Sequence, residues 1–327
     1  MNAPQWPGCQ TENKANYMNK LFFIFFTCLI LPAVYGQEVS PYKDTSNKYG
    51  LKNEIGDIVL EPQYQMIYEF SGNLALVLQN DKYGYIDKTG KLVIPAQYID
   101  AGFFREGLAT FKVDSLFGYI DTAGTIVIPA KYKNAEFFSD GLAYIEFDID
   151  MRDAGHWAFI DKKGKIIISS KKNGLSFHAS YFQDGLTVVD NRDSRGGEGD
   201  GWYGYMNKAG KLVLPMKYWS ASPFTQGVAF VGFQTDVQNY RLINKTGNLV
   251  SNLKFSRVND FSEGLAAVAF CKTQIAEDKC SWGYIDKTGK LVIPAKYSEA
   301  DGFKKGVATV ILNGKKIKID KTGKVIE

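Results

Sequence analysis

Short apolar runs separated by a fixed polar spacer are the main pattern along this chain of 327 residues. In the clearest copy, residues 85–86 (YI) precede the spacer 87–90 (DKTG), and residues 92–94 (LVI) follow it. Aromatic and β-branched residues favour strands, while an aspartate and a glycine in the spacer favour a tight turn. The pattern predicts a β-hairpin. Pro95, which cannot donate to a sheet ladder, is predicted to end its second strand.

A second phrase lies between the hairpins. It reads YIDAGFFREGLA at residues 98–109, YKNAEFFSDGLA at 132–143 and YSEADGFKKGVA at 297–308. Its glycine followed by Leu-Ala or Val-Ala predicts a turn and a further strand. Residues 98–104 fit either a short strand or an irregular turn. Each unit therefore has three predicted strands, with a fourth left open.

The hairpin phrase recurs eight times, which predicts a repeat architecture. Its turn glycines are Gly56, Gly90, Gly124, Gly164, Gly210, Gly247, Gly289 and Gly323. The Leu-Ala strand has seven copies, near Leu74, Leu108, Leu142, Leu186, Val228, Leu265 and Val307. One unit has too little apolar surface to fold alone, so neighbouring units must stack.

These phrases resemble the WG-repeat family (KWG repeat), a bacterial family named for the Trp-Gly at the head of each unit, as in residues 282–283. The similarity covers residues 49–326, and Tyr or Phe often replaces the Trp. The resemblance brings no catalytic residue with it. By analogy with WD-type blades, we expect an all-β, propeller-like ring of seven to eight small antiparallel blades, with an open superhelix as the alternative.

The amino terminus has the layout of a secretory signal peptide. Residues 21–31 (LFFIFFTCLIL) are apolar but too few to span a bilayer, and small residues precede Gln37. We expect translation to start at Met18 and residues 1–36 to be removed. Residues 37–48 are interpreted as a linker, and 49–327 as one domain of seven units plus a terminal hairpin. The expected location is the periplasm, cell surface or extracellular space, with no transmembrane segment in the mature chain.

Composition agrees with a folded protein, because 45% of the residues are hydrophobic and 14% aromatic. The net charge of +4 is too small, and too evenly spread, for a dedicated nucleic-acid binder. Cys271 and Cys280 remain after signal removal. In an oxidising compartment such a pair is expected to form a disulfide, which we favour over a zinc site because neither histidine is close in sequence.

Two sets of repeated charges have a structural and a functional interpretation. The spacer acids (Asp87, Asp121, Asp161, Asp286 and Asp320) could suggest calcium binding or acid catalysis, but Asn53, Asn207 and Asn244 occupy the same position and favour turn capping. Lysines follow the turn glycine at Lys91, Lys165, Lys211, Lys290 and Lys324. We favour solvated turns over a basic stripe for anionic glycans or lipid head groups.

Three long insertions follow Leu-Ala strands, at residues 148–156, 190–201 and 271–281. Equivalent loops lie on one face of a repeat stack and often build its binding surface. The candidate binding residues are Asp148, Asp150, Asp153, Asp190, Asp193, Glu198, Asp200, Trp202 and Trp219. Flexible acidic loops are favoured over Ca²⁺ sites, since no EF-hand pattern is present. The tryptophans could stack on sugars or be buried.

No catalytic motif emerges from the sequence: a G-x-S-x-G, H-E-x-x-H, P-loop or dinucleotide fingerprint is missing. We therefore predict an exported, non-catalytic scaffold that needs no metal or cofactor, acts as a monomer and presents its loop-rich face to a protein or a cell-surface glycan. The alternatives are a glycan-active enzyme that uses loop carboxylates, and a purely structural envelope component.

Overall fold

The computed structural model describes residues 38–147, 157–173, 178–191, 202–233, 236–271 and 280–326. Over this part of the chain the strands form seven small antiparallel sheets, which confirms the all-β prediction. One helix of four residues, α1 (Ser170–Asn173), interrupts them. Residues 1–36, with the predicted signal peptide and Met18, lie outside the described residues. The closed ring and the open superhelix both stay predictions.

We number the repeats as units 1 to 8, one for each Asp/Asn-x-x-Gly hairpin. Unit 1 contains β1 (Val39–Lys43), β2 (Tyr49–Asn53) and β3 (Ile58–Tyr64). Unit 2 contains β4 (Met66–Ser71), β5 (Leu74–Gln79), β6 (Lys82–Asp87) and β7 (Leu92–Tyr98). Unit 3 contains β8 (Asp100–Ala101), β9 (Leu108–Val113), β10 (Leu116–Asp121) and β11 (Ile126–Tyr132). Unit 4 contains β12 (Asn134–Ala135), β13 (Leu142–Glu146), β14 (Trp157–Asp161) and β15 (Ile166–Ser169).

The later units follow the same order. Unit 5 contains β16 (His178–Gln183), β17 (Leu186–Asp190), β18 (Tyr203–Asn207) and most of β19 (Leu212–Ala221), whose end pairs with β20 (Val228–Phe233) of unit 6. Unit 6 continues with β21 (Asp236–Asn244). Unit 7 contains β22 (Arg257–Val258), β23 (Leu265–Cys271), β24 (Cys280–Asp286) and β25 (Leu291–Tyr297). Unit 8 contains β26 (Glu299–Ala300), β27 (Val307–Leu312) and β28 (Lys315–Asp320).

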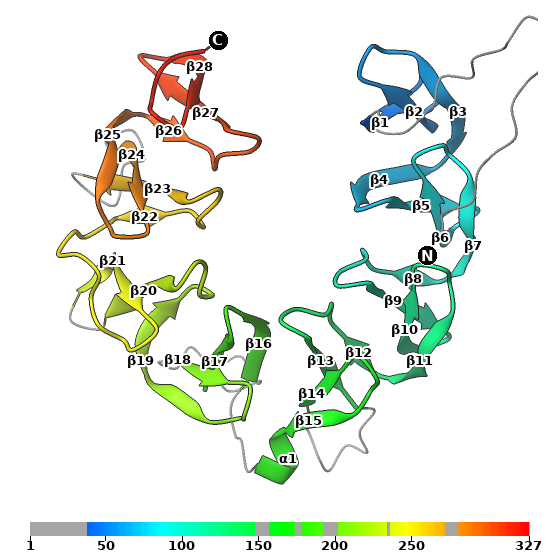
Figure 1. Cartoon of the computed structure of the whole chain (residues 1–327), viewed down its shortest axis with the longest axis horizontal. Helices are drawn as coiled ribbons and strands as arrows, with labels where there is room; N and C mark the ends of the chain where they lie inside the picture. Colours follow the sequence, from blue (N-terminus) through cyan, green and yellow to red (C-terminus); the bar gives the residue numbers. More distant parts are fainter. Residues whose placement is uncertain are drawn as a thin grey trace, which may run out of the picture. The chain divides into compact units, whose positions relative to one another are not determined.

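A complete unit is a meander in which neighbours in sequence are neighbours in the sheet, as in β4-β5-β6-β7 (Figure 1). The undecided segment 98–104 contains the two-residue strand β8, so the optional fourth strand exists. We call the short strand the first strand, the Leu-Ala strand the second, and the two strands of the hairpin the third and fourth.

The amino-terminal segment differs from its interpretation as a linker. Val39 to Lys43 form β1, and its pairing with β2 begins at Val39↔Asn53. The pairing of β5 with β6 begins at the equivalent residues, Leu74↔Asp87. β1 is thus the second strand of unit 1 and an eighth copy of the Leu-Ala strand. Its sequence, VSPYK, lacks the Gly-Leu-Ala signature, which is why it was missed.

The predicted effect of Pro95 is wrong, because β7 runs through it from Leu92 to Tyr98. β7 lies at an edge of its sheet, where a missing N–H is tolerated. The register also shifts here, between the pairs Tyr85↔Ile94 and Tyr83↔Tyr98. Gly84 faces this irregularity, and a Cβ atom there would lie 2.6 Å from the carbonyl oxygen of Ile94. The proline therefore belongs to a bulge that requires a glycine opposite.

The turn-capping role of the spacer acids is confirmed. The Oδ1 atom of Asp87 accepts hydrogen bonds from the N–H groups of Thr89 (2.9 Å) and Lys91 (3.1 Å). Asn207 makes the same two bonds, to Ala209 and Lys211, with its amide oxygen. Because an amide serves as well as a carboxylate, the turn needs an acceptor and no charge.

The hydrophobic core is divided into seven clusters, each made by two consecutive units. Second strands such as β5, β13 and β17 are buried on both faces, so they read as continuous apolar runs, whereas β1 has no buried residue. In β5, Leu74 and Leu76 pack toward unit 3, while Ala75 and Val77 pack toward unit 1. Every boundary between units is therefore itself a core.

A tyrosine on the third strand connects one unit to the next. The ring of Tyr85 packs on Phe104 of unit 3 with ring centroids 4.7 Å apart, and its hydroxyl donates to the carbonyl of Gly102 at 2.7 Å. Tyr119, Tyr205 and Tyr284 make the same hydroxyl contact with the following unit at 2.8 Å. Burial raises the pKa of Tyr85, so the hydroxyl stays protonated and remains a donor.

Replacing Tyr119 with Phe should lower the free energy of unfolding by about 1 kcal/mol, because the carbonyl of Glu136 loses its partly buried hydrogen bond while the packing is retained. Calorimetry of Tyr119→Phe measures the loss. Tyr181→Phe is the matched control, since that hydroxyl makes no hydrogen bond with a described residue. Equal melting temperatures for the two variants would contradict the role of the Tyr119 hydroxyl in connecting units 3 and 4.

Candidate binding site

Each unit has two edges that carry turns. One edge holds the two-residue turn before the second strand and the Asp/Asn-x-x-Gly hairpin, residues 105–108 and 121–125 in unit 3. We call it the glycine rim. The opposite edge holds the connection between the second and third strands, where the three long insertions occur, and we call it the insertion rim.

The turns before the second strands have an unusual backbone. Glu106 and Gly107 both have positive φ, at 52° and 87°, between the paired residues Arg105 and Leu108. Left-handed residues at both central positions match the twist of a hairpin. The non-glycine residue recurs as Asp140, Asp184, Gln226, Glu263 and Lys305. This turn points its side chain toward the following unit.

Four of these side chains join one unit to the next. Glu106 accepts from the N–H of Gly141 at 3.0 Å, and Glu263 accepts from Gly306 at 2.9 Å. Asp140 and Asp184 accept in the same way from Gly185 (2.5 Å) and Gly227 (2.6 Å). The acceptor belongs to one unit and the donor to the next unit along the chain.

A lysine from the next unit's hairpin completes each contact. Lys162 Nζ donates to the main-chain carbonyl of Glu106 at 2.8 Å and lies 3.2 Å from its carboxylate. Lys208, Lys245 and Lys321 donate to the corresponding carbonyls of Asp140, Asp184 and Glu263. We call the carboxylate, the glycine N–H and the lysine together the rim clamp. Its hydrogen bonds lower the pKa of Glu263, with the bond from Lys321 contributing most.

Unit 8 carries a reversed clamp. Lys305 stands where four other turns have an acid, and its ammonium donates to the carboxylate of Glu38 in unit 1. Glu54 of unit 1 occupies the hairpin position that holds lysine in units 2 and 4 to 8. The hydrogen bond that Lys305 donates to Glu38, the charge of Glu38 and the charge of Glu54 raise the pKa of Lys305. The signs of both partners are inverted relative to the other clamps.

The clamp is missing between units 2 and 3. Gly72 stands where Glu106 and its equivalents stand, and Thr122 replaces the hairpin lysine. A cavity of about 530 Å³ opens at this position. It is lined by Ser71, Gly72, Asn73, Leu74, Phe104, Glu106, Gly107 and Thr122. We call it the notch.

At the boundary between units 6 and 7, Gln226 replaces the acid of the clamp. Its side chain forms no clamp hydrogen bond among the described residues. The side chain is nevertheless as long as a glutamate, and Lys287 is retained in the following hairpin. Only the boundary between units 2 and 3 loses both long side chains. The notch lies at this boundary.

Ser71 is half-buried, and its hydroxyl donates to the main-chain carbonyl of Phe104 at 2.5 Å, whereas the other polar residues of the lining are exposed. Leu74 and Phe104 form a buried apolar floor. The N–H of Gly107 corresponds to the donor that binds a carboxylate at four other boundaries, and it has no partner among the described residues. Glu106 is engaged on its other side by Gly141 and Lys162. The notch thus offers a vacant donor above an apolar surface.

Sequence reasoning missed the notch. Its signal is visible only after the units are aligned, when Gly72 and Thr122 stand where most other copies have Glu or Asp and Lys.

Most of the predicted binding residues lie outside the described residues: Asp148, Asp150, Asp153, Asp193, Glu198 and Asp200. Asp190 ends β17, and Trp202 lies beside it at the base of the insertion. The main-chain N–H of Trp202 donates to Asn191 Oδ1 at 2.7 Å. Trp219, on β19, is half-buried against Gly232 and Tyr240, with ring centroids 5.5 Å apart. These three stand near one end of units 5 and 6. Their role in binding stays a prediction.

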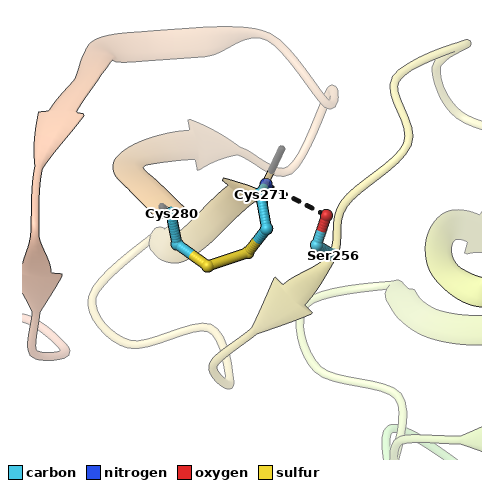
Figure 2. Close-up of a disulfide and its surroundings, with 3 residues drawn as sticks. All are labelled: Ser256, Cys271 and Cys280. Carbon is cyan, nitrogen blue, oxygen red and sulfur yellow. Dashed lines mark hydrogen bonds between the residues drawn. A yellow bond between two sulfur atoms is a disulfide. The ribbon is translucent and has the colours of Figure 1, made fainter. Parts of the chain in front are cut away.

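The predicted disulfide between Cys271 and Cys280 is present. The two cysteines face each other across β23 and β24, and the N–H of Cys271 donates to Ser256 Oγ at 3.1 Å (Figure 2). The bridge closes the insertion of unit 7 at its base. The structure thus supports the disulfide interpretation over the zinc site.

Solvated turns and a basic stripe both stay predictions for the repeated lysines of the glycine rim. The lysines after the turn glycines (Lys91, Lys165, Lys211, Lys290 and Lys324) are all exposed. Within the described ranges, His, Cys, Asp and Glu do not gather in threes as a metal site would require. The helical part of the described chain offers no segment long and apolar enough for a membrane span.

Comparison with known proteins agrees with this repeat arrangement. The sequence matches the family described as "WG containing repeat" at residues 49–83, 83–116, 117–148, 203–232, 240–269 and 282–315. These segments cover more than half of the chain, which therefore belongs to the WG-repeat family. No curated protein sequence matches it significantly.

Among solved structures, a crystal structure of the eukaryotic initiation factor aligns with 89% of this chain and 84% of its own, at a TM-score of 0.56 and 12% identity. The β-propeller domain of the Trilobed protease from Pyrococcus furiosus aligns with 81% and 98%, at a TM-score of 0.42 and 9% identity. Hsv2 from Kluyveromyces lactis aligns with 78% and 94%, at a TM-score of 0.40 and 12% identity. The likeness concerns the fold alone, which is propeller-like.

Reversing one charge of the reversed clamp should destabilise the protein, and reversing both should restore it. Lys305→Glu places like charges together and should lower the melting temperature; Lys305→Glu with Glu38→Lys should recover most of the loss. Salt should shrink the effect. Additive losses in the double variant would contradict the pairing.

The same contact predicts a pH dependence. Lys305, by its hydrogen bond and charge, holds the pKa of Glu38 below its usual value of 4.5. The stabilisation is therefore complete above pH 4.5 and is lost as the pH falls through the lowered pKa. Calorimetry should show that the effect of Lys305→Gln fades in that acidic range. An effect of Lys305→Gln that is the same at pH 7 and pH 3 would exclude a role for the Glu38 charge.

Proposed function

We propose that this protein is an exported, non-catalytic binding scaffold that holds a ligand in the notch between units 2 and 3. The proposal depends on one observation, made at the boundary between units 2 and 3. The rim clamp fills the equivalent position at four other boundaries, and its loss here leaves a cavity of about 530 Å³. This volume lies within the range of about 300–1,000 Å³ that is usual for small-molecule sites.

The chemistry of the lining supports binding without turnover. Glu106 is the only carboxylate that lines the notch, and it is already bonded to Gly141 and Lys162. Ser71 and Thr122 have no histidine or second carboxylate beside them in the lining. General acid–base or nucleophilic catalysis needs such a partner. The WG-repeat fold agrees, in general terms, with an interaction scaffold.

Export is supported by the residues themselves. Residues 1–36 carry the basic, apolar and small-residue pattern of a signal peptide. The pairing of Cys271 with Cys280 fits an oxidising compartment. In this proposal the insertion rim is a second surface, for a protein or a cell-surface glycan.

Refilling the notch tests the proposed site. Gly72→Glu with Thr122→Lys reintroduces both members of the clamp, and this variant should lose the binding that the wild-type protein shows on peptide and glycan arrays. Ala123→Lys is the control for the added lysine, because it places the same charge as Thr122→Lys one residue outside the lining, where unit 4 has Lys163. A variant that lacks residues 190–201 tests the insertion rim separately, because binding that is lost only in this variant belongs to that rim.

The outcomes separate the function classes. Wild-type binding that persists in the refilled variant would remove the notch from the proposal. Bound glycans should stay intact. Their hydrolysis, abolished by replacing one loop carboxylate, would identify the glycan-active enzyme instead.

Amino-terminal sequencing of the protein recovered outside the cytoplasm tests export. The mature chain should begin at Gln37, because small residues at Val34 and Gly36 permit cleavage there. Substituting Gly36 with a bulky residue such as Arg should block cleavage at this position. A mature chain that begins upstream of residue 30 would contradict the proposed signal peptide.

A further inference from the structure

We infer that the notch binds a ligand carrying both a carboxylate and an ammonium group, a free amino acid or a short peptide. This inference rests on the proposed function and adds the ligand's chemistry. It follows from what fills the same position elsewhere in the protein. At three other boundaries a carboxylate and a lysine ammonium occupy it together, 3.2, 3.7 and 3.0 Å apart.

The carboxylate has a vacant donor. Gly141, Gly185, Gly227 and Gly306 each give their N–H to a side-chain carboxylate of the preceding unit. Gly107 occupies the same turn position, lines the notch, and has no such carboxylate because Gly72 has no side chain. Hydrogen bonds from a backbone N–H to a charged oxygen are among the stronger ones in proteins. A ligand carboxylate therefore takes the place of the missing Glu or Asp.

The ammonium group has a vacant acceptor. Lys162 Nζ donates to the main-chain carbonyl of Glu106, and Lys321 Nζ donates to that of Glu263. The equivalent carbonyl at the notch belongs to Gly72, and Thr122 is too short to supply an ammonium group. A ligand ammonium can occupy this position. Its distance from the carboxylate in the clamps is short enough for one small molecule to carry both groups.

The surrounding charge permits this pairing. Lys162 neutralises Glu106, the one ionised group that lines the notch, at 3.2 Å. The ligand carboxylate is therefore not repelled by an unpaired acid. Leu74 and Phe104 form the apolar floor, which suits a small side chain or a methyl group. The cavity of about 530 Å³ lies within the range usual for small-molecule sites, so both an amino acid and a dipeptide are tested.

Titration calorimetry on the purified protein tests the inference with four probes. L-Alanine and Ala-Ala carry both charged groups and distinguish a free amino acid from a peptide. N-acetyl-alanine lacks the ammonium group, and alaninamide lacks the carboxylate. We expect L-alanine or Ala-Ala to bind at least tenfold more tightly than either capped compound. Equal affinities for the charged and capped probes would overturn the inference.

The refilled variant supplies an independent readout. Gly72→Glu with Thr122→Lys should abolish the heat of binding of the zwitterionic probes and raise the melting temperature, because a new clamp joins units 2 and 3. Ala123→Lys should bind them as the wild type does. If the double variant is unstable, Thr122→Lys alone should weaken binding at least tenfold, since its ammonium competes with that of the ligand.

The two proposals fail differently. If the zwitterionic probes do not bind while refilling still abolishes binding on the arrays, the ligand chemistry is wrong and the proposed function stands. If refilling leaves array binding unchanged, the notch is not a site and both proposals fall.

Discussion

The contact between an aromatic ring on the third strand of one unit and a phenylalanine of the next is the interaction on which this fold depends. The ring of Tyr85 packs on Phe104 in this way, and the rings of Tyr119, Tyr205 and Tyr284 make the same contact at other boundaries. A single unit buries little alone, so its stability comes from its neighbours. The hydroxyl bond adds direction to this packing, because a carbonyl of the next unit can accept it only when the two units are in register.

The rim clamp is a second, polar layer at the same boundaries. It lies on exposed turns, where ion pairs contribute little to stability. Its importance here is geometric: a left-handed turn residue, a glycine N–H and a lysine fix how the rims of two units meet. Because the aromatic core supplies the stability, one boundary can omit the clamp without unfolding. The notch exists because these two layers are independent.

The sequence predicted the repeated elements well, because Asp-x-x-Gly and Gly-Leu-Ala determine local backbone geometry wherever they occur. It failed where geometry depends on a neighbour. Pro95 lies within a strand because Gly84 opposite accommodates the bulge, and β1 forms because β2 offers a free edge. The notch was missed for the same reason: Gly72 and Thr122 lie 50 positions apart and become adjacent only when two units stack.

The reversed signs at Lys305 and Glu38 have a consequence for how repeats of this kind are counted. In units 2 and 4 to 8, the hairpin position facing the preceding turn carries a lysine, which would repel Lys305. Unit 1 carries Glu54 there instead. The last unit is therefore matched in charge to the first and mismatched with almost every other. A duplication or loss of internal repeats would preserve this match, so the array can change its length in evolution while keeping the identity of its two ends.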